Sequence, residues 1–166
     1  IPLIKPNWLS LAIKIDKNTE IVFETVSNLK EGDKVLLSFA YGASTKPEIH
    51  PMAVALLKHL FSKGVYVYIV SLWPEGPIMA YQALDEVWET DLFNKPHKAN
   101  KKNGYWKMGE NDGKYYPNYL IFDYKVGGFV VIKGIADNFR EIYKQDVSGF
   151  NIDELDLMRD INSVED

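Results

Sequence analysis

Residues 35–73 read VLLSFAYGASTKPEIHPMAVALLKHLFSKGVYVYIVSLW and decide the fold class. Residues 35–41 form an apolar run of strand length, and residues 65–73 form a second run rich in β-branched and aromatic side chains. Between these runs, apolar residues at helical spacing begin near Pro51 and stop at Gly64. A helix between two strands makes a crossover rather than a hairpin, so the two strands are predicted to be parallel.

One further strand and three further helices complete the predicted order. The helices are expected at 16–29, at about 77–93 and at 129–146, and the strand at 118–124. The last helix is expected to place these apolar residues inside: Val130, Val131, Ile135, Phe139 and Ile142. Residues 35–41 lack alternation, which is typical of a strand buried on both faces, so this first strand is predicted to be central. The fold class is therefore α/β, with a three-layer Rossmann-like or flavodoxin-like parallel sheet of strand order 2-1-3.

Composition places the chain among globular proteins and excludes several kinds of site. The 166 residues are 46% hydrophobic and 25% charged, which fits a single domain over 1–166. The formal net charge of −4 argues against general nucleic-acid binding. No cysteine is present and the three histidines are not at a metal-ligand spacing, so neither a metal site nor a cofactor is expected.

Residues 95–117 have no sustained periodicity and are predicted to be a loop excursion within the domain. Their lysines alternate with tyrosine and tryptophan, a mixture that can bind single-stranded nucleic acid. The acidic total instead favours a solvated loop or a protein-contact surface. We expect this excursion to be the most mobile or most partner-dependent part of the molecule.

A strand order of 2-1-3 would open a crevice at the carboxyl ends of strands 1 and 3, where two polar loops follow the strands. The candidate ligand-binding residues there, and in the turn after strand 2, are Tyr41, Ser44, Lys46, Trp73, Glu75, Lys125, Gly127 and Gly128. Glu48 and His50 are the candidate catalytic acid and base, because histidine titrates near neutrality beside a carboxylate.

Each of these candidates also has a purely structural interpretation. A glutamate and a histidine at the start of a helix are more often a first-turn acid and a satisfied polar residue. Gly127 and Gly128 could bring backbone N–H groups to an anion beside Lys125, but a tight strand-to-helix turn needs glycines as well. Trp73 and Glu75 form either a rigid ligand edge or ordinary packing at a strand end.

The chain ends suggest a membrane context. The chain begins IPLIKPNWL, in which Lys5 and Trp8 are residue types that flank a membrane–water boundary, although a processed soluble terminus fits equally well. We expect 1–166 to be a fragment of a longer protein with an exposed sheet edge near strand 3, through which it binds a protein partner or self-associates.

Several segments also carry a resemblance to a known family: GDKVLLSFAYGASTKPEIHPMAVALLKHLFSKG, SLWPEGPIMAYQAL, DYKVGGFVVIKGIADNF and DLMRDI. Together they resemble an uncharacterised prokaryotic family of membrane-anchored α/β proteins that has no assigned activity. The resemblance implies an α/β domain between hydrophobic anchors, with more sheet after the last residue here. It transfers no catalytic residue.

Two functions follow as hypotheses. The first is a ligand-sensing or protein-interaction domain displayed at a membrane surface, as a soluble domain outside the bilayer on a side that the sequence does not define. The alternative is a small-molecule hydrolase or transferase that uses the crevice at the carboxyl ends of strands 1 and 3. A nucleic-acid partner is not expected.

Overall fold

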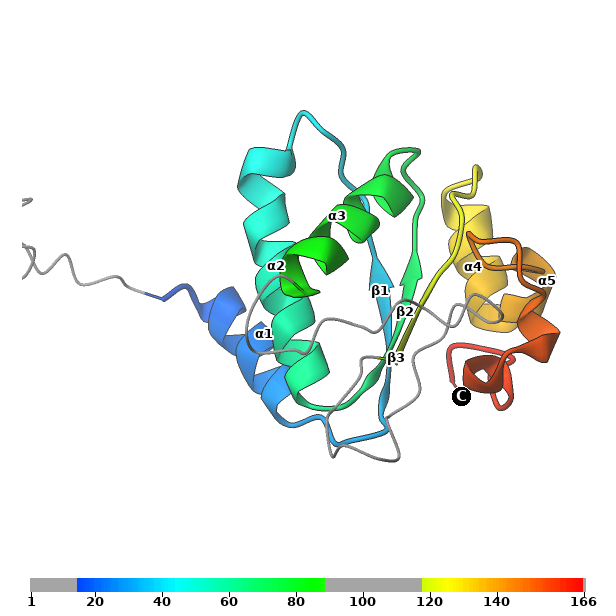
Figure 1. The fold of residues 1–166 in the computed structure, drawn as a ribbon, viewed down its shortest axis with the longest axis horizontal. Helices are drawn as coiled ribbons and strands as arrows, with labels where there is room; N and C mark the ends of the chain where they lie inside the picture. Colours follow the sequence, from blue (N-terminus) through cyan, green and yellow to red (C-terminus); the bar gives the residue numbers. More distant parts are fainter. Residues whose placement is uncertain (1–14, 89–117, 166) are drawn as a thin grey trace, which may run out of the picture.

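The computed structural model describes residues 15–88 and 118–165. The predicted excursion at 95–117 and the residues Lys5 and Trp8 lie outside them. The described elements are α1 (Lys17–Ser27), β1 (Lys34–Ser38), α2 (Lys46–Ser62), β2 (Tyr66–Val70), α3 (Gly76–Trp88), β3 (Asn118–Ile121), α4 (Phe129–Asp137), α5 (Phe139–Ile142) and the 3-10 turns η2 (Ile152–Glu154) and η3 (Asp156–Met158). Helices cover both faces of an all-parallel sheet, which confirms the α/β class and the parallel pairing (Figure 1).

The predicted strand order is wrong. The described strands lie in the order β1-β2-β3, so β2 rather than β1 is central. Val67 of β2 is in register with Val35 on one side and with Tyr119 on the other. Both connections run in the same direction across the sheet, and α2 and α3 accordingly pack against each other on one face (Figure 1).

The burial of the two strands explains the error. In β2 every residue from Val67 to Val70 is buried, as expected of a central strand. In β1 burial alternates, with Val35 and Leu37 half-buried under α2 and Leu36 41% exposed on the other face. The apolar run at 35–41 therefore belongs to an edge strand with only one covered face.

Two hydrophobic clusters fill the space on either side of the sheet. Val67, Ile69 and Ile121 point toward α2 and α3, while Tyr68, Val70 and Leu120 point toward α4, α5 and the C-terminal segment. Figure 1 shows α1, α2 and α3 to one side of the strands and α4 and α5 to the other. The described residues thus form three layers, with β2 between two cores.

The single helix predicted at 129–146 is two helices. The chain leaves α4 at Asn138, which has extended backbone angles, and α5 follows directly. Val131, Ile135 and Phe139 are buried as predicted, but Val130 is 74% exposed. The prediction of burial at Val130 overlooked Lys133 and Asp137, the charged residues of α4, which lie on the same side of the helix as Val130.

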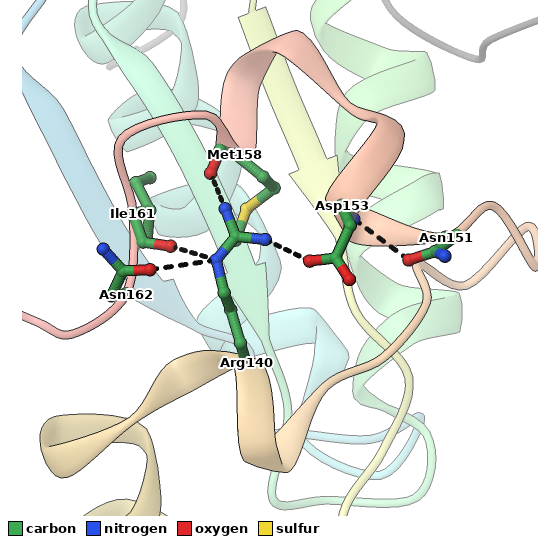
Figure 2. A network of polar contacts seen from close by, with 6 residues as sticks. All are labelled: Arg140, Asn151, Asp153, Met158, Ile161 and Asn162. Carbon is green, nitrogen blue, oxygen red and sulfur yellow. Dashed lines mark hydrogen bonds and ion pairs between the residues drawn. The ribbon is translucent and has the colours of Figure 1, made fainter.

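Arg140 fastens the C-terminal segment to α5 (Figure 2). Its guanidinium donates to the backbone carbonyls of Met158 and Ile161, the latter at 2.8 Å. It also donates to the Asn162 side chain at 3.2 Å and forms an ion pair with Asp153. A single side chain therefore satisfies carbonyls at the end of η3 and beyond it, which holds this segment over the second core.

We expect Arg140→Met to lower the free energy of unfolding by about 2–4 kcal/mol, because the Met158 and Ile161 carbonyls lose their donor. Arg159→Met is the matched control, since Arg159 is 74% exposed and pairs only within its own turn with Asp156. That control should cost less than about 1 kcal/mol. Urea unfolding measures both, and equal losses in the two variants would contradict this role for Arg140.

Candidate functional site

A chain of three hydrogen-bonded side chains joins the predicted polar loop after β1 to α2 and α3, and it runs from two buried residues to a half-exposed carboxylate. Tyr41 Oη lies 2.7 Å from His50 Nδ1, and His50 Nε2 lies 3.0 Å from Glu86 Oε1 on α3. An ionised carboxylate only accepts, so in the neutral imidazole Nε2 donates to Glu86 and Nδ1 accepts from the Tyr41 hydroxyl. Tyr41 and His50 are 5% and 4% exposed, whereas the Glu86 side chain is 50% exposed, so this relay ends at the surface.

Glu86 is the partner that the sequence analysis missed. The predicted carboxylate, Glu48, is exposed in the first turn of α2, and Glu86 reaches His50 from the neighbouring helix. One turn earlier on each helix, Lys46 Nζ donates to Gln82 Oε1 at 2.7 Å. The sequence signal for this partner was therefore a pair of polar residues at i, i+4 on each of two helices that pack together: Lys46 and His50 on α2, and Gln82 and Glu86 on α3.

Burial, with a smaller contribution from the nearby Glu86 carboxylate, raises the pKa of Tyr41 to about 12. The neutral phenol is thus favoured across the physiological range, which suits a hydrogen-bond donor and not a nucleophile. As an arrangement, the relay can hold the loop against α3. Its only exposed member is the Glu86 carboxylate, since Tyr41 and His50 are buried.

Glu75 also binds the loop internally. Its carboxylate accepts from the Ala43 N–H at 2.6 Å, and a Cβ at Gly42 would displace that carboxylate and break the bond. Ser44 is exposed at the loop surface, and Trp73 is 52% exposed in the neighbouring turn. Of the predicted ligand residues, Glu75 and Lys46 thus bond to protein groups in adjacent elements.

The predicted crevice between strands 1 and 3 does not form, because β2 separates them. The loops at 41–46 and 123–128 follow strands two positions apart, about 10 Å, with the turn after β2 between them. That turn is fixed to both neighbours: Ser71 Oγ donates to the Phe39 carbonyl at 2.7 Å, and the Lys125 N–H donates to the Ser71 carbonyl at 3.1 Å.

Lys125, Gly127 and Gly128 form the turn into α4. Both glycines have positive φ, 139° and 49°, which favours glycine at these positions. The Lys125 ammonium lies 5.3 Å from the centre of the Tyr143 ring, a cation–π distance. These glycines therefore have a structural role in the turn, and the lysine is placed over an aromatic face.

Tyr143 is buried to 1% exposure, and its hydroxyl has no hydrogen-bond partner among the described residues. Burial raises the pKa of Tyr143 to about 12, and Asp123 adds to the rise. The ring packs on Phe122 and Phe139 with centroids 4.9 and 5.1 Å away. Its apolar contacts stabilise the second core, while its hydroxyl costs stability.

Two grooves flank β1. The first, of about 420 Å³, is called the α1 groove and is lined by Val22, Thr25, Val26, Leu29, Lys34, Val35, Leu36, Leu37, Leu56 and Leu60. The second, of about 440 Å³, is called the C-terminal groove and is lined by Leu29, Gly32, Asp33, Lys34, Leu36, Tyr68, Phe139, Ile161, Ser163, Val164 and Glu165. Leu36 lines both grooves, so they border the same strand edge.

Comparison of the chain with protein-family models, curated proteins and solved structures gave no match. Within residues 15–88 and 118–165, no three acidic or histidine side chains gather as a metal site would require. The helices of that same part of the chain are too short or too polar to cross a membrane. The expected family resemblance and the membrane context therefore stay predictions.

We expect the stability difference between the native chain and Tyr41→Phe to shrink at alkaline pH. An unfolded tyrosine ionises near pH 10 and the folded Tyr41 near 12, so its stabilisation is complete below about pH 10. It is then lost as pH rises toward 12, by about 1.4 kcal/mol per pH unit. Urea unfolding across this range measures the difference, and a constant difference would show that Tyr41 does not titrate this way.

Tyr143→Phe should raise the free energy of unfolding by about 1 kcal/mol, because it removes a buried hydroxyl without a partner and keeps the ring. The matched control is Tyr68→Phe, whose lost hydroxyl donates to the Leu157 carbonyl at 2.6 Å. This control should lower stability by about 1–3 kcal/mol. Thermal unfolding distinguishes them, and destabilisation by Tyr143→Phe would reveal a partner for that hydroxyl.

Proposed function

We propose that this chain is a protein-interaction domain that pairs through the outer edge of β1 with β1 of a second copy. The observation that carries the proposal is the open edge itself. Among the described residues only β2 pairs with β1, so the other side of β1 has no neighbouring strand there. On the outer side of β3, by contrast, the Val147 N–H donates a hydrogen bond to the Ile121 carbonyl at 2.9 Å. The proposal therefore uses the edge beside strand 1, whereas the sequence had suggested the edge near strand 3.

The backbone of β1 offers hydrogen-bonding groups to a partner. Tyr66 donates its N–H to the Asp33 carbonyl at 2.8 Å, and Phe39 donates to the Val70 carbonyl at 2.9 Å. Alternate residues of a parallel strand face the same neighbour, so Leu36 and Ser38 direct their N–H and C=O groups outward. An exposed row of this kind pairs readily with another extended chain.

The side chains around this edge are apolar. Leu36 is 41% exposed between the two grooves, and Val22 on α1 is 51% exposed beside the α1 groove. The C-terminal segment covers β2 but leaves the corresponding face of β1 open. An apolar edge with a groove on each side is typical of a protein-binding surface.

The sequence of β1 is compatible with pairing to itself. In an antiparallel pair centred on Leu36, each Leu36 faces its counterpart, and Lys34 of one copy faces Ser38 of the other. No like charges oppose each other in this register. A twofold axis perpendicular to the sheet would then join the two sheets into one.

The position of the edge agrees with doubly wound sheets. The order β1-β2-β3 is that of one half of a Rossmann-like sheet, in which the outer side of the first strand receives a further strand. Three consecutive strands in this order occur in both the Rossmann-like and the flavodoxin-like arrangement. In this proposal the second copy supplies the added strand.

The buried relay supports a binding role over a hydrolase or transferase. Tyr41 and His50 are each at most 5% exposed and already bond to protein groups, which leaves a substrate little access to them. A ligand-sensing role at the same loop would likewise require Tyr41 and His50 to be accessible to the ligand.

Cysteine cross-linking tests the register directly, because the native chain contains no cysteine. We expect Leu36→Cys to form a disulfide-linked dimer, since opposed Cα atoms lie about 5.5 Å apart in a hydrogen-bonded antiparallel pair. Lys34→Cys alone should not cross-link, because the two copies of residue 34 would lie about 14 Å apart. A mixture of Lys34→Cys and Ser38→Cys should form the mixed dimer.

Sedimentation of cysteine-free variants gives the second measurement. Leu36→Lys should yield a monomer by placing two like charges face to face, while Met52→Lys, at a site on α2 that is 66% exposed, should leave the dimer intact. A native chain that is monomeric at all concentrations, or equal cross-linking of Leu36→Cys and Lys34→Cys, would overturn the proposal. So would an edge occupied by another segment of the same chain.

A further inference from the structure

Helix α1 is anchored to the rest of the molecule mainly at its C-terminal end. The Ser27 carbonyl accepts a hydrogen bond from Lys63 Nζ at 2.8 Å, and the Phe23 ring lies 4.8 Å from the His59 ring. All residues from 15 to 25 are exposed, and the first turns of α1 lie apart from the other described elements (Figure 1). Most of the helix therefore projects from the body of the domain.

The side of α1 that faces β1 is apolar. Ile15, Val22, Val26 and Leu29 follow one another at helical spacing along this side, and the last three line the α1 groove. Val26 is buried and Leu29 is half-buried, whereas Ile15 and Val22 are 67% and 51% exposed. A helix of 11 residues is marginal in water unless its apolar side is packed, so the exposed part of this side is expected to have an occupant.

The α1 groove runs along the edge at which the second copy is proposed to pair. This groove of about 420 Å³ has α1 on one side and apolar residues of two elements on the other: Val35, Leu36 and Leu37 of β1 and Leu56 and Leu60 of α2. Because β1 is the edge strand of the described sheet, a strand added to its outer side would run along this groove. The groove is thus continuous with the proposed interface, which identifies the second copy as its occupant.

The alternation of side chains decides which residues of the second copy enter the groove. Val35 and Leu37 point to the side of the sheet that α2 covers. In the antiparallel pair centred on Leu36, Val35 of one copy lies opposite Leu37 of the other, and opposed residues point to the same face. A twofold axis perpendicular to the sheet leaves each face on its own side. Val35 and Leu37 of the second copy therefore point to the side that carries α1.

The short length of β1 makes a contact of this kind necessary for a stable dimer. The strand has five residues, and two strands of this length paired in isolation are marginally stable at best in water. Specific interfaces bury about 1,200–2,000 Å² of surface in total. Side-chain contacts beside the paired strands must supply most of this area, and the exposed apolar side of α1 borders those strands.

We propose that α1 packs against the second copy in the β1 dimer, so that Val35 and Leu37 of that copy fill the α1 groove of the first. The inference rests on the proposed function and adds a second element, α1, to that interface. The twofold axis makes the contact reciprocal. Val22 gains the contact, whereas Ile21, which is 49% exposed, does not line the groove and serves as the matched control.

Thiol reactivity tests the contact in the full 166-residue chain, which has no native cysteine. The thiol of Val22→Cys should react with a maleimide about tenfold more slowly once about nine-tenths of the chain is dimer, because a covered thiol is inaccessible. The thiol of Ile21→Cys should react at the same rate in the monomer and in the dimer. Sedimentation of the same samples gives the dimer fraction at each protein concentration.

Charged substitutions provide an independent measurement of the same contact. Val22→Lys should weaken the dimer at least about tenfold, because it carries a charge into an apolar groove. Ile21→Lys should change the dimer affinity by no more than about twofold, as is usual for a surface substitution. Both positions are about half exposed in the single chain, so both variants are expected to fold, which urea unfolding checks.

The outcomes separate this inference from the proposed function. A dimer that still cross-links through Leu36→Cys, but in which Val22→Cys and Ile21→Cys react equally fast, would overturn the contact of α1 alone. A chain that never dimerises would overturn both. Protection of Val22→Cys at every concentration, even when combined with Leu36→Lys, would show that the same chain fills the groove, and this result would also overturn the inference.

Discussion

The rest of the fold depends on the burial of β2 on both faces. Val67 and Ile69 contact one core and Tyr68 and Val70 the other, and none of the four is more than 4% exposed. A strand of this kind needs a helical layer on each side and a strand at each edge. Helices α2 and α3 supply the first layer, and α4, α5 and the C-terminal segment supply the second.

The two layers are unequal, and the inequality leaves surface uncovered. The first layer extends over β1, where Val35 and Leu37 pack under α2. The second layer is short and is held over β2 by two contacts, the Arg140 network and the bond from Tyr68 Oη to the Leu157 carbonyl. It therefore ends before β1, so Leu36 stays exposed. No helix of the described residues lies against the outer side of α4, where Phe129 and Val130 are exposed.

The sequence was sufficient for the element types but not for their arrangement. Strand length, the glycine stop at Gly64 and the helical spacing in α2 are local signals, and the structure follows them. Strand order is not local, because the apolar run at β1 is compatible with burial on one face or two. Val130 is a different case, because Lys133 and Asp137 lie on its side of α4 and were a local signal of exposure. Glu86 was missed because its role depends on the packing of α3 against α2.

The location of polar groups bears on where function should be sought. At the carboxyl end of the sheet, Glu75, Ser71 and the Tyr41–His50–Glu86 relay bond to the protein itself, which accounts for side chains that would look catalytic in the sequence. The groups left open are the backbone edge at Leu36 and the apolar side chains of α4. Polar groups that bond to the protein itself differ from those of an enzyme cleft, in which converging polar side chains line an apolar hollow. This distribution supports the proposed interaction through the outer edge of β1.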